Sequence, residues 1–418
     1  MSTPRPVPLF LVFALGYFFS ALLRAVTATL APEFSAELGL SAADLGLLAG
    51  VFFAGFASTQ LPLGSALDRF GPKRVLLAFM AVGVLSCAAF ALARSFETLL
   101  LARTLMGVGL SASLMAALTA FRHAYDPATQ FRATSWMLMT GSLGMLASTL
   151  PTHALLPVVG WRGLFWLAGV ALILCALLLA WIVPADAPSR PRGATTSTES
   201  GWRVYLDIWR HPTFARVAPI GFVHYGGLIA VQTLWAGPWL TEVCRLTPQQ
   251  AAQGLFFLNF SMLCGFAALG VAAPRWAAAG WGAERLVRWV APFSAALLAI
   301  IALAGEHAGP PAIVLWCVSC IVLSLSQPAV GQAFSAHQVG RALSAFNLVI
   351  FLGVFAVQWS LGLLIDALIG RGWPRDQAHQ AALFALAMAC LLSYARFRMA
   401  SPSPRSRESD APAEKGAE

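Results

Sequence analysis

The sequence contains twelve apolar stretches of at least twenty residues each, separated by polar segments. A helix rises 1.5 Å per residue, so each stretch is long enough to cross a hydrocarbon core of about 30 Å. Stretches of this length favour helices, which satisfy all of their own backbone hydrogen bonds in lipid. We therefore expect an all-α membrane protein with twelve transmembrane helices, at 9–31, 44–67, 74–93, 97–121, 130–151, 163–183, 214–240, 249–273, 286–305, 310–333, 342–365 and 377–398.

The charged residues support a membrane protein and exclude a nucleic-acid-binding one. Only 11% of the residues are charged, whereas a soluble domain carries roughly a quarter. The net charge of +9 does not form a basic stripe, and no base-stacking motif accompanies it. Instead, Lys and Arg flank the apolar stretches. With the N-terminus inside, 20 of the 27 fall on the cytoplasmic side and 5 outside, which predicts that both termini are cytoplasmic.

One long connection divides the chain into two sets of six spans. It is rich in Pro, Ser, Thr and Arg up to Ser200, and then places Trp202, Tyr205, Leu206 and Trp209 on one face of a short helix. Such a face favours a helix that lies on the membrane surface. We expect four parts: an N-terminal six-helix bundle at 1–184, a cytoplasmic linker with this interfacial helix at 185–213, a C-terminal six-helix bundle at 214–400 and a disordered cytoplasmic tail at 401–418.

The turn between the second and third spans carries the most specific motif. It includes Gly64, Asp68, Arg69, Gly71 and Arg74. In spacing, these residues resemble the G-x-L-x-D-R-x-G-R-[RK] signature of the major facilitator superfamily, and the six-plus-six layout extends the resemblance over nearly the whole chain. The usual Leu and Arg of the signature are replaced by Ala66 and Pro72.

The resemblance implies a function as well as a fold. The fold would be two six-helix bundles around a central cavity. The activity would be secondary transport of a small solute by alternating access, in a bacterial inner membrane, as a monomer that needs no cofactor or metal. The five motif residues would act in gating, because the family aspartate faces the start of the eleventh span. Asp68 would latch the cytoplasmic side near that helix N-terminus. The alternative is that Asp68 only shapes the turn.

Two arginines lie inside predicted spans. Arg24 and Arg103 each lie about seven residues from the outer end of a span, which places both roughly 10 Å deep. A cation at this depth is costly unless it is paired, and no acid lies near a span centre. We therefore expect an anionic solute held by both guanidiniums. The alternative is that Arg103 caps backbone carbonyls and Arg24 extends its charged end outwards.

The second half offers uncharged polar groups at depth. His224, Tyr225 and Gln232 in the seventh span and Gln327 in the tenth are further candidates for solute contacts, although hydrogen bonds between helices would equally account for each of them. His224 is also the candidate for proton coupling, since its ordinary pKa lies near neutrality. The alternative is a neutral histidine in the packing.

Other functions fit the sequence less well. An enzyme is not favoured, because the chain has no H-E-x-x-H, no carboxylate pair at depth and no nucleophile elbow. An exporter of a neutral or amphipathic metabolite or drug stays open, although the fifth span lacks the G-P-x-x-G-G segment of drug–proton antiporters. A membrane sensor or assembly factor that does not transport is the alternative of another class.

Overall fold

The computed structural model describes residues 6–184, 201–335 and 338–400, and within these ranges it is helical and contains no strand. The first half consists of α1 (Pro6–Leu38), α2 (Ala42–Ser58), α3 (Gln60–Phe70), α4 (Pro72–Leu92), α5 (Phe96–Leu110), α6 (Ser113–Ala124), α7 (Pro127–Ala147) and α8 (Leu150–Ile182). These elements follow the first six predicted spans in order.

Between the halves lies α9 (Gly201–Arg210), in the linker segment whose spacing predicts a short helix. The remaining elements are α10 (Pro212–Pro219), η1 (Ile220–Tyr225), α11 (Gly226–Ala230), η2 (Val231–Trp235), α12 (Ala236–Pro238), η3 (Trp239–Val243), α13 (Pro248–Ala278), α14 (Ala283–Ala304), η4 (Gly305–His307), α15 (Pro310–Cys320), η5 (Ile321–Leu325), α16 (Ser326–Ala333), α17 (Val339–Ile369) and α18 (Arg375–Met399). The predicted tail at 401–418 and the flexible stretch at 185–200 lie outside the described residues.

Ten helices in the described ranges are long and apolar enough to cross a membrane, and the pair α2 and α3, bent by 46°, makes an eleventh. The remaining predicted span corresponds to α7. With 21 residues it has the length of a span, but it carries Gln130, Arg132 and several Thr and Ser and is therefore less apolar.

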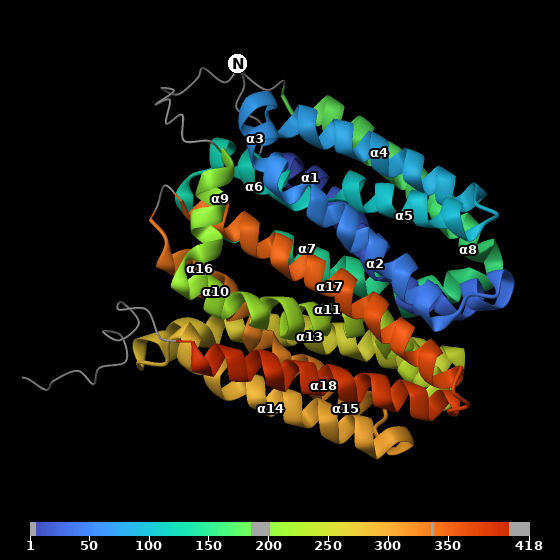
Figure 1. Cartoon of the computed structure of the whole chain (residues 1–418). Coiled ribbons are helices and arrows are strands. Elements are labelled where there is room, and N and C mark those ends of the chain that lie inside the picture. Colours follow the sequence, from blue (N-terminus) through green and yellow to red (C-terminus); the bar gives the residue numbers. More distant parts are fainter. Residues whose placement is uncertain (1–5, 185–200, 336–337, 401–418) are drawn as a thin grey trace, which may run out of the picture.

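The two halves lie side by side, and α2 and α17 run along each other between them (Figure 1). Helix α9 lies at one end of the bundle, which we call the linker end; α1 begins there and α18 ends there (Figure 1). We call the opposite end, with the turns at 39–41, 93–95 and 244–247, the far end. Three helices begin at the far end with side-chain caps, those of Ser41 on α2, Ser95 on α5 and Thr247 on α13.

Two local features differ from the prediction. We expected a loop between 151 and 163, but the helix resumes at Leu150 and breaks only at Gly160, whose φ of 66° favours glycine. We also expected a regular seventh span at 214–240. It runs from Pro212 to Val243 and contains three π-helical segments, η1, η2 and η3. A π-helical turn widens the helix and re-aims its side chains, and such turns occur often at functional sites.

Candidate functional site

The backbones of the two halves touch at the far end through glycines. A Cβ on Gly46 of α2 would collide with the carbonyl oxygen of Gln358 in α17, and one on Gly362 of α17 would collide with that of Ala42. Gly237 of α12 lies equally close to the Ala28 carbonyl of α1. Small residues allow helices to approach this closely in lipid. The far end of the interface is therefore closed.

Towards the middle of the interface, aromatic rings replace the glycines. Phe56 of α2 packs on Phe351 of α17 with ring centroids 4.6 Å apart, and Phe53 lies 6.2 Å from the same ring. These rings come from different halves, so they form an apolar contact that must change whenever the halves move apart.

Arg24 lies beside this aromatic contact and has a free guanidinium. Its central carbon is 5.2 Å from the Phe56 ring centroid, which is a cation–π distance. Among the residues that the structure describes, none hydrogen-bonds the Arg24 side chain, and its Nε is buried without a partner. The side chain is only half-buried. Arg24 therefore keeps its donors available for a ligand.

Two tyrosines lie around Arg24. Tyr225, at the end of η1, is within electrostatic reach of both Tyr17 and Arg24. Neither phenolic hydroxyl donates to a described residue. Tyr17 itself packs against Gly141 of α7. One guanidinium and two phenols from both halves thus converge on one region, and all three are donors that suit an oxyanion.

Arg103 has a different environment from Arg24. Its side chain is only 1% exposed. Nη1 donates to the Leu23 carbonyl at 2.8 Å and Nη2 to the Thr27 hydroxyl at 2.6 Å, with a longer bond to the Arg24 carbonyl. Its guanidinium also lies 4.8 Å from the Phe52 ring centroid. These contacts favour the alternative in which Arg103 caps backbone carbonyls, and they tie α5 to α1.

The other polar candidates are bonded to neighbouring helices. The His224 Nε2 lies 2.8 Å from the Cys390 carbonyl of α18, inside the second half and away from Arg24's helix. Gln232 donates to Asn259 of α13 at 2.9 Å, and Gln327 of α16 donates to Asn347 of α17 at 2.7 Å. Of the four candidates in the second half, the structure places only Tyr225 near Arg24.

The predicted gating residues lie on α3 and at the start of α4, at the linker end. Gly71, with a φ of 82°, ends α3. Gly64, Asp68, Arg69 and Arg74 are exposed. No described residue hydrogen-bonds the Asp68 carboxylate.

Helix α3 does pack against α17, as the latch hypothesis requires. The neighbouring Lys73, which is not one of the five motif residues, donates to the Ala180 and Val183 carbonyls and so caps the end of α8.

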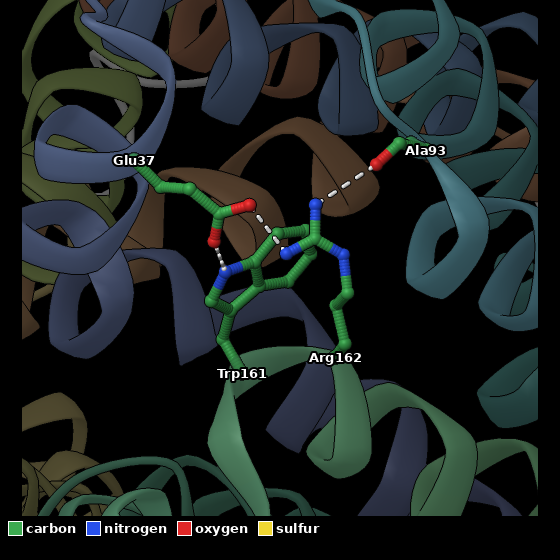
Figure 2. A network of polar contacts seen from close by, with 4 residues as sticks. All are labelled: Glu37, Ala93, Trp161 and Arg162. Atoms are coloured by element: carbon green, nitrogen blue, oxygen red, sulfur yellow. Dashed lines mark hydrogen bonds and ion pairs between the residues drawn. The ribbon is translucent and has the colours of Figure 1, made fainter.

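Within the first half, one network of polar contacts lies at the far end. The Glu37 carboxylate of α1 accepts from the Trp161 indole and the Arg162 guanidinium of α8 (Figure 2). Arg162 also donates to the Ala93 carbonyl at 3.1 Å, and its guanidinium lies over the Trp161 ring. The hydrogen bond from Trp161 is the main reason that the pKa of Glu37 is lowered. The network joins three helices of the same half, so we expect it to move as one body.

The family model for the Major Facilitator Superfamily matches residues 13–358 of this chain. The chain belongs to this superfamily. Among solved structures, a bacterial homologue of the human lysosomal transporter Spinster, in an inward-facing and unoccupied conformation, superposes with a TM-score of 0.74. The superposition covers 99% of this chain and 100% of that one at 19% identity, which shows the fold alone.

Curated members of the superfamily match over shorter stretches. A probable L-galactonate transporter of Escherichia coli (strain K12) is 28% identical over 199 residues, 48% of this chain and 42% of that protein. A probable sulfoacetate transporter of Cupriavidus necator is 27% identical over 256 residues, 58% of each. The multidrug resistance protein MdtM of Salmonella typhimurium is 27% identical over 254 residues, 55% of this chain and 59% of that protein. The matches thus span about half the length of these relatives.

Sequence reasoning missed several residues of the candidate site in this superfamily member. Tyr17 lies seven residues before Arg24, two turns of α1 apart and on the same face, so helical spacing could have found it. Phe56 and Phe351 could not have been found in this way, since their contact joins two halves. Asp366, which the sequence places at an outer helix end, bonds across the halves as described below.

Proposed function

We propose that this protein is a secondary transporter of a small organic anion, which passes between the two halves by alternating access. The observation that carries the proposal is the free guanidinium of Arg24, with Tyr17 and Tyr225 beside it at the interface. A cation in a membrane interior is expensive unless something neutralises it, and an intramembrane ionisable residue marks a functional site. No described acid forms an ion pair with Arg24.

The surroundings of Arg24 favour a carboxylate or sulfonate over a bare inorganic ion. A guanidinium offers parallel donors that match the two oxygens of such a group. The Phe56 and Phe351 rings beside it would contact the carbon part of the solute. Two of the relatives have names that specify organic anions, galactonate and sulfoacetate, which supports the same class.

The charge distribution supports an orientation. Of the described Lys and Arg, most lie at the linker end, so we assign that end to the cytoplasmic side of a bacterial inner membrane, and with it both termini. The glycine contacts at the far end then close the outer side. We further propose that residues 1–184 and 214–400 are the two moving bundles, that 185–213 links them on the cytoplasmic surface, and that the protein works as a monomer.

An exporter of neutral or amphipathic solutes is the second candidate. The aromatic rings at the interface and the match to a multidrug resistance protein favour it. Such a solute would bind to the rings and gain little from Arg24. The dependence of transport on the Arg24 charge therefore separates the two candidates, and a protein that moves no solute would be a sensor or assembly factor.

Uptake by the purified protein in liposomes tests the proposal. The solutes would be galactonate, sulfoacetate and other carboxylates, with neutral sugars and a lipophilic cation for comparison. We expect uptake of at least one organic anion, its loss in Arg24→Gln, and partial retention in Arg24→Lys, which keeps the charge without the planar fork. Arg94→Gln, which changes an exposed arginine at the far end, is the matched control. Transport of only neutral or cationic solutes, unchanged in Arg24→Gln, would overturn the proposal.

A further inference from the structure

Helices α2 and α17 run antiparallel, and an acid follows near the C-terminal end of each path: Asp68 on α3, which continues α2, and Asp366 on α17 itself. Asp68 lies near the end of α3, which continues α2 towards the linker end, and Asp366 lies three residues before the end of α17, at the far end. Each acid is therefore close to the level at which the other helix begins. Unpaired N–H groups at a helix start attract a carboxylate, so either acid can bond to the opposite half.

At the far end this bond is made. The Asp366 carboxylate accepts from the backbone N–H of Ala42 at 3.1 Å through one oxygen and from that of Ala43 at 2.8 Å through the other. The Ser41 hydroxyl accepts from the next N–H, that of Asp44. The first three N–H groups of α2 are thus satisfied, and two of them depend on a residue of the other half, 323 and 324 positions along the chain.

The backbone contacts nearby make this bond part of a closed seam. Gly362, one turn before Asp366, lies against the Ala42 carbonyl, and Gly46 lies against the Gln358 carbonyl. The side-chain amide of Gln358 donates to Thr233 of the seventh span at 3.0 Å. At the other close contact between the halves, that of Gly237 with Ala28, a cavity of only about 20 Å³ between α1 and α13 has room for one water. Separating the halves at the seam requires both Asp366 bonds to break.

At the linker end the corresponding bond is absent from the described structure. Asp68 is exposed, and no described residue hydrogen-bonds it. Gly64, one turn before it, has open space where a Cβ would be. The same helix pair is therefore bonded by an acid at one end and not at the other, as expected of a transporter that closes its two sides in turn.

We infer that Asp366 is a gating residue, which latches the far end of the two halves by capping α2 and is released when that end opens. This inference rests on alternating access between the halves, but it does not depend on the chemistry of the solute. It assigns to the end of α17 a role that the sequence motif suggests only for Asp68.

A distance measurement between the halves tests the latch without a substrate. Spin labels would be placed at Arg94→Cys and Glu306→Cys, two exposed positions in far-end turns of different halves. The two native cysteines that are not buried would be changed in the same background, as Cys244→Ser and Cys264→Ser. Pulsed electron paramagnetic resonance of the full chain in nanodiscs then reports how often the far end is open.

We expect one short distance for the background protein, which keeps Asp366 and its bonds to α2, and a second, longer distance when Asp366 is changed. Asp366→Ala removes both bonds and should raise the open fraction at least about tenfold, because hydrogen bonds to a charged group are among the stronger ones. Asp366→Asn keeps one acceptor and should give a smaller rise. Glu242→Gln, which neutralises another exposed acid of the far end, is the matched control and should leave the distances unchanged.

Two outcomes would overturn the latch. The first is an unchanged distance distribution in Asp366→Ala and Asp366→Asn, with both proteins monodisperse and helical. If Asp366→Ala does not fold, Asp366→Asn decides alone. The second is an equal shift in Glu242→Gln, which would indicate a general effect of charge. Failure of the proposed solute class looks different, since the distances would then respond to Asp366 while no anion depends on Arg24.

Discussion

Arg24 and Arg103 lie at a similar depth in neighbouring helices, yet their surroundings differ in kind. Arg103 is almost fully buried and bonded to carbonyl and hydroxyl oxygens of α1, where it fastens one helix of the first half to another. Arg24 is half-buried, stacks on Phe56 at the boundary between the halves and has no described hydrogen-bond partner. One cation is used by the fold, and the other is available to a solute.

The difference shows why depth alone does not identify a binding residue. A guanidinium whose two Nη atoms are already bonded to the protein, as those of Arg103 are, has little left to offer a ligand. One whose Nη atoms are unbonded at an interface gains most from binding an oxyanion. The same contrast separates two further pairs of residues, Tyr225 from His224 and Asp366 from Asp68. It also separates the interface between the halves from the Glu37 network within one half.

The largest expected effect is on stability, at Arg103. Arg103→Leu leaves the Leu23 carbonyl and the Thr27 hydroxyl without their donor, and we expect a loss of about 3 kcal/mol, because buried polar groups without partners are costly. Thermal unfolding in detergent should show an apparent Tm lower by roughly 5 °C or more. Arg94→Leu, at an exposed position, should leave the Tm unchanged. If Arg103→Leu were as stable as the parent, Arg103 would not stabilise the packing of α5 against α1.

The next effect is on rate, at Asp68. Asp68→Asn removes the charge that we expect to latch the linker end in the opposite state. It should slow uptake into liposomes several-fold while changing the affinity for the solute at most a few-fold, since Asp68 lies far from Arg24 along α2 and α3. A lost binding site with a normal rate of opening would contradict this assignment.

In the second half, His224 and Tyr225 are adjacent in the chain but differ in their surroundings. Its ring is bonded to the Cys390 carbonyl of α18, whereas the adjacent Tyr225 reaches towards Arg24. His224→Gln should therefore cost about 1 kcal/mol of stability and leave the dependence of uptake on an imposed pH gradient unchanged. Uncoupled uptake in this variant would restore His224 as the proton-coupling residue.

The smallest effect concerns the Glu37 network. The pKa of Glu37 is lowered in the folded protein, mainly by the Trp161 hydrogen bond. Its contribution to stability is therefore present above the ordinary carboxyl pKa, and it is lost as the pH falls through the lowered value. Because the pair is exposed, we expect a change in Tm of only about 1 °C below pH 4. Glu37→Gln should remove that acid sensitivity, and an unaltered pH profile would contradict the role of this network.

The spans and their division into two sets follow from patterns that are local in the sequence. Each span must be apolar over its whole length, so hydropathy reveals it, and α7 is less clear because polar residues interrupt it. The break at Gly160 and the π-helical segments of the seventh span are not visible in this way, because they depend on how neighbouring helices pack.

The candidate site was predictable only in part. Arg24 and Tyr225 were found because polar residues in apolar stretches are conspicuous. The partners of Arg103 and the contact of Asp366 with α2 join positions far apart in the chain, which helical spacing does not encode. Sequence reasoning therefore identified polar residues within the spans, and it could not tell which of them the fold already bonds to neighbouring helices.

The most direct test of the account is the affinity of the purified protein for organic anions, measured by calorimetry for the parent and Arg24→Gln. We predict that an anion bound by the parent binds roughly 100-fold more weakly to Arg24→Gln, the equivalent of about 2.7 kcal/mol for a bidentate charged contact, while the Tm without ligand stays the same. Equal affinities in the two proteins would contradict the assignment of Arg24 as the anion contact.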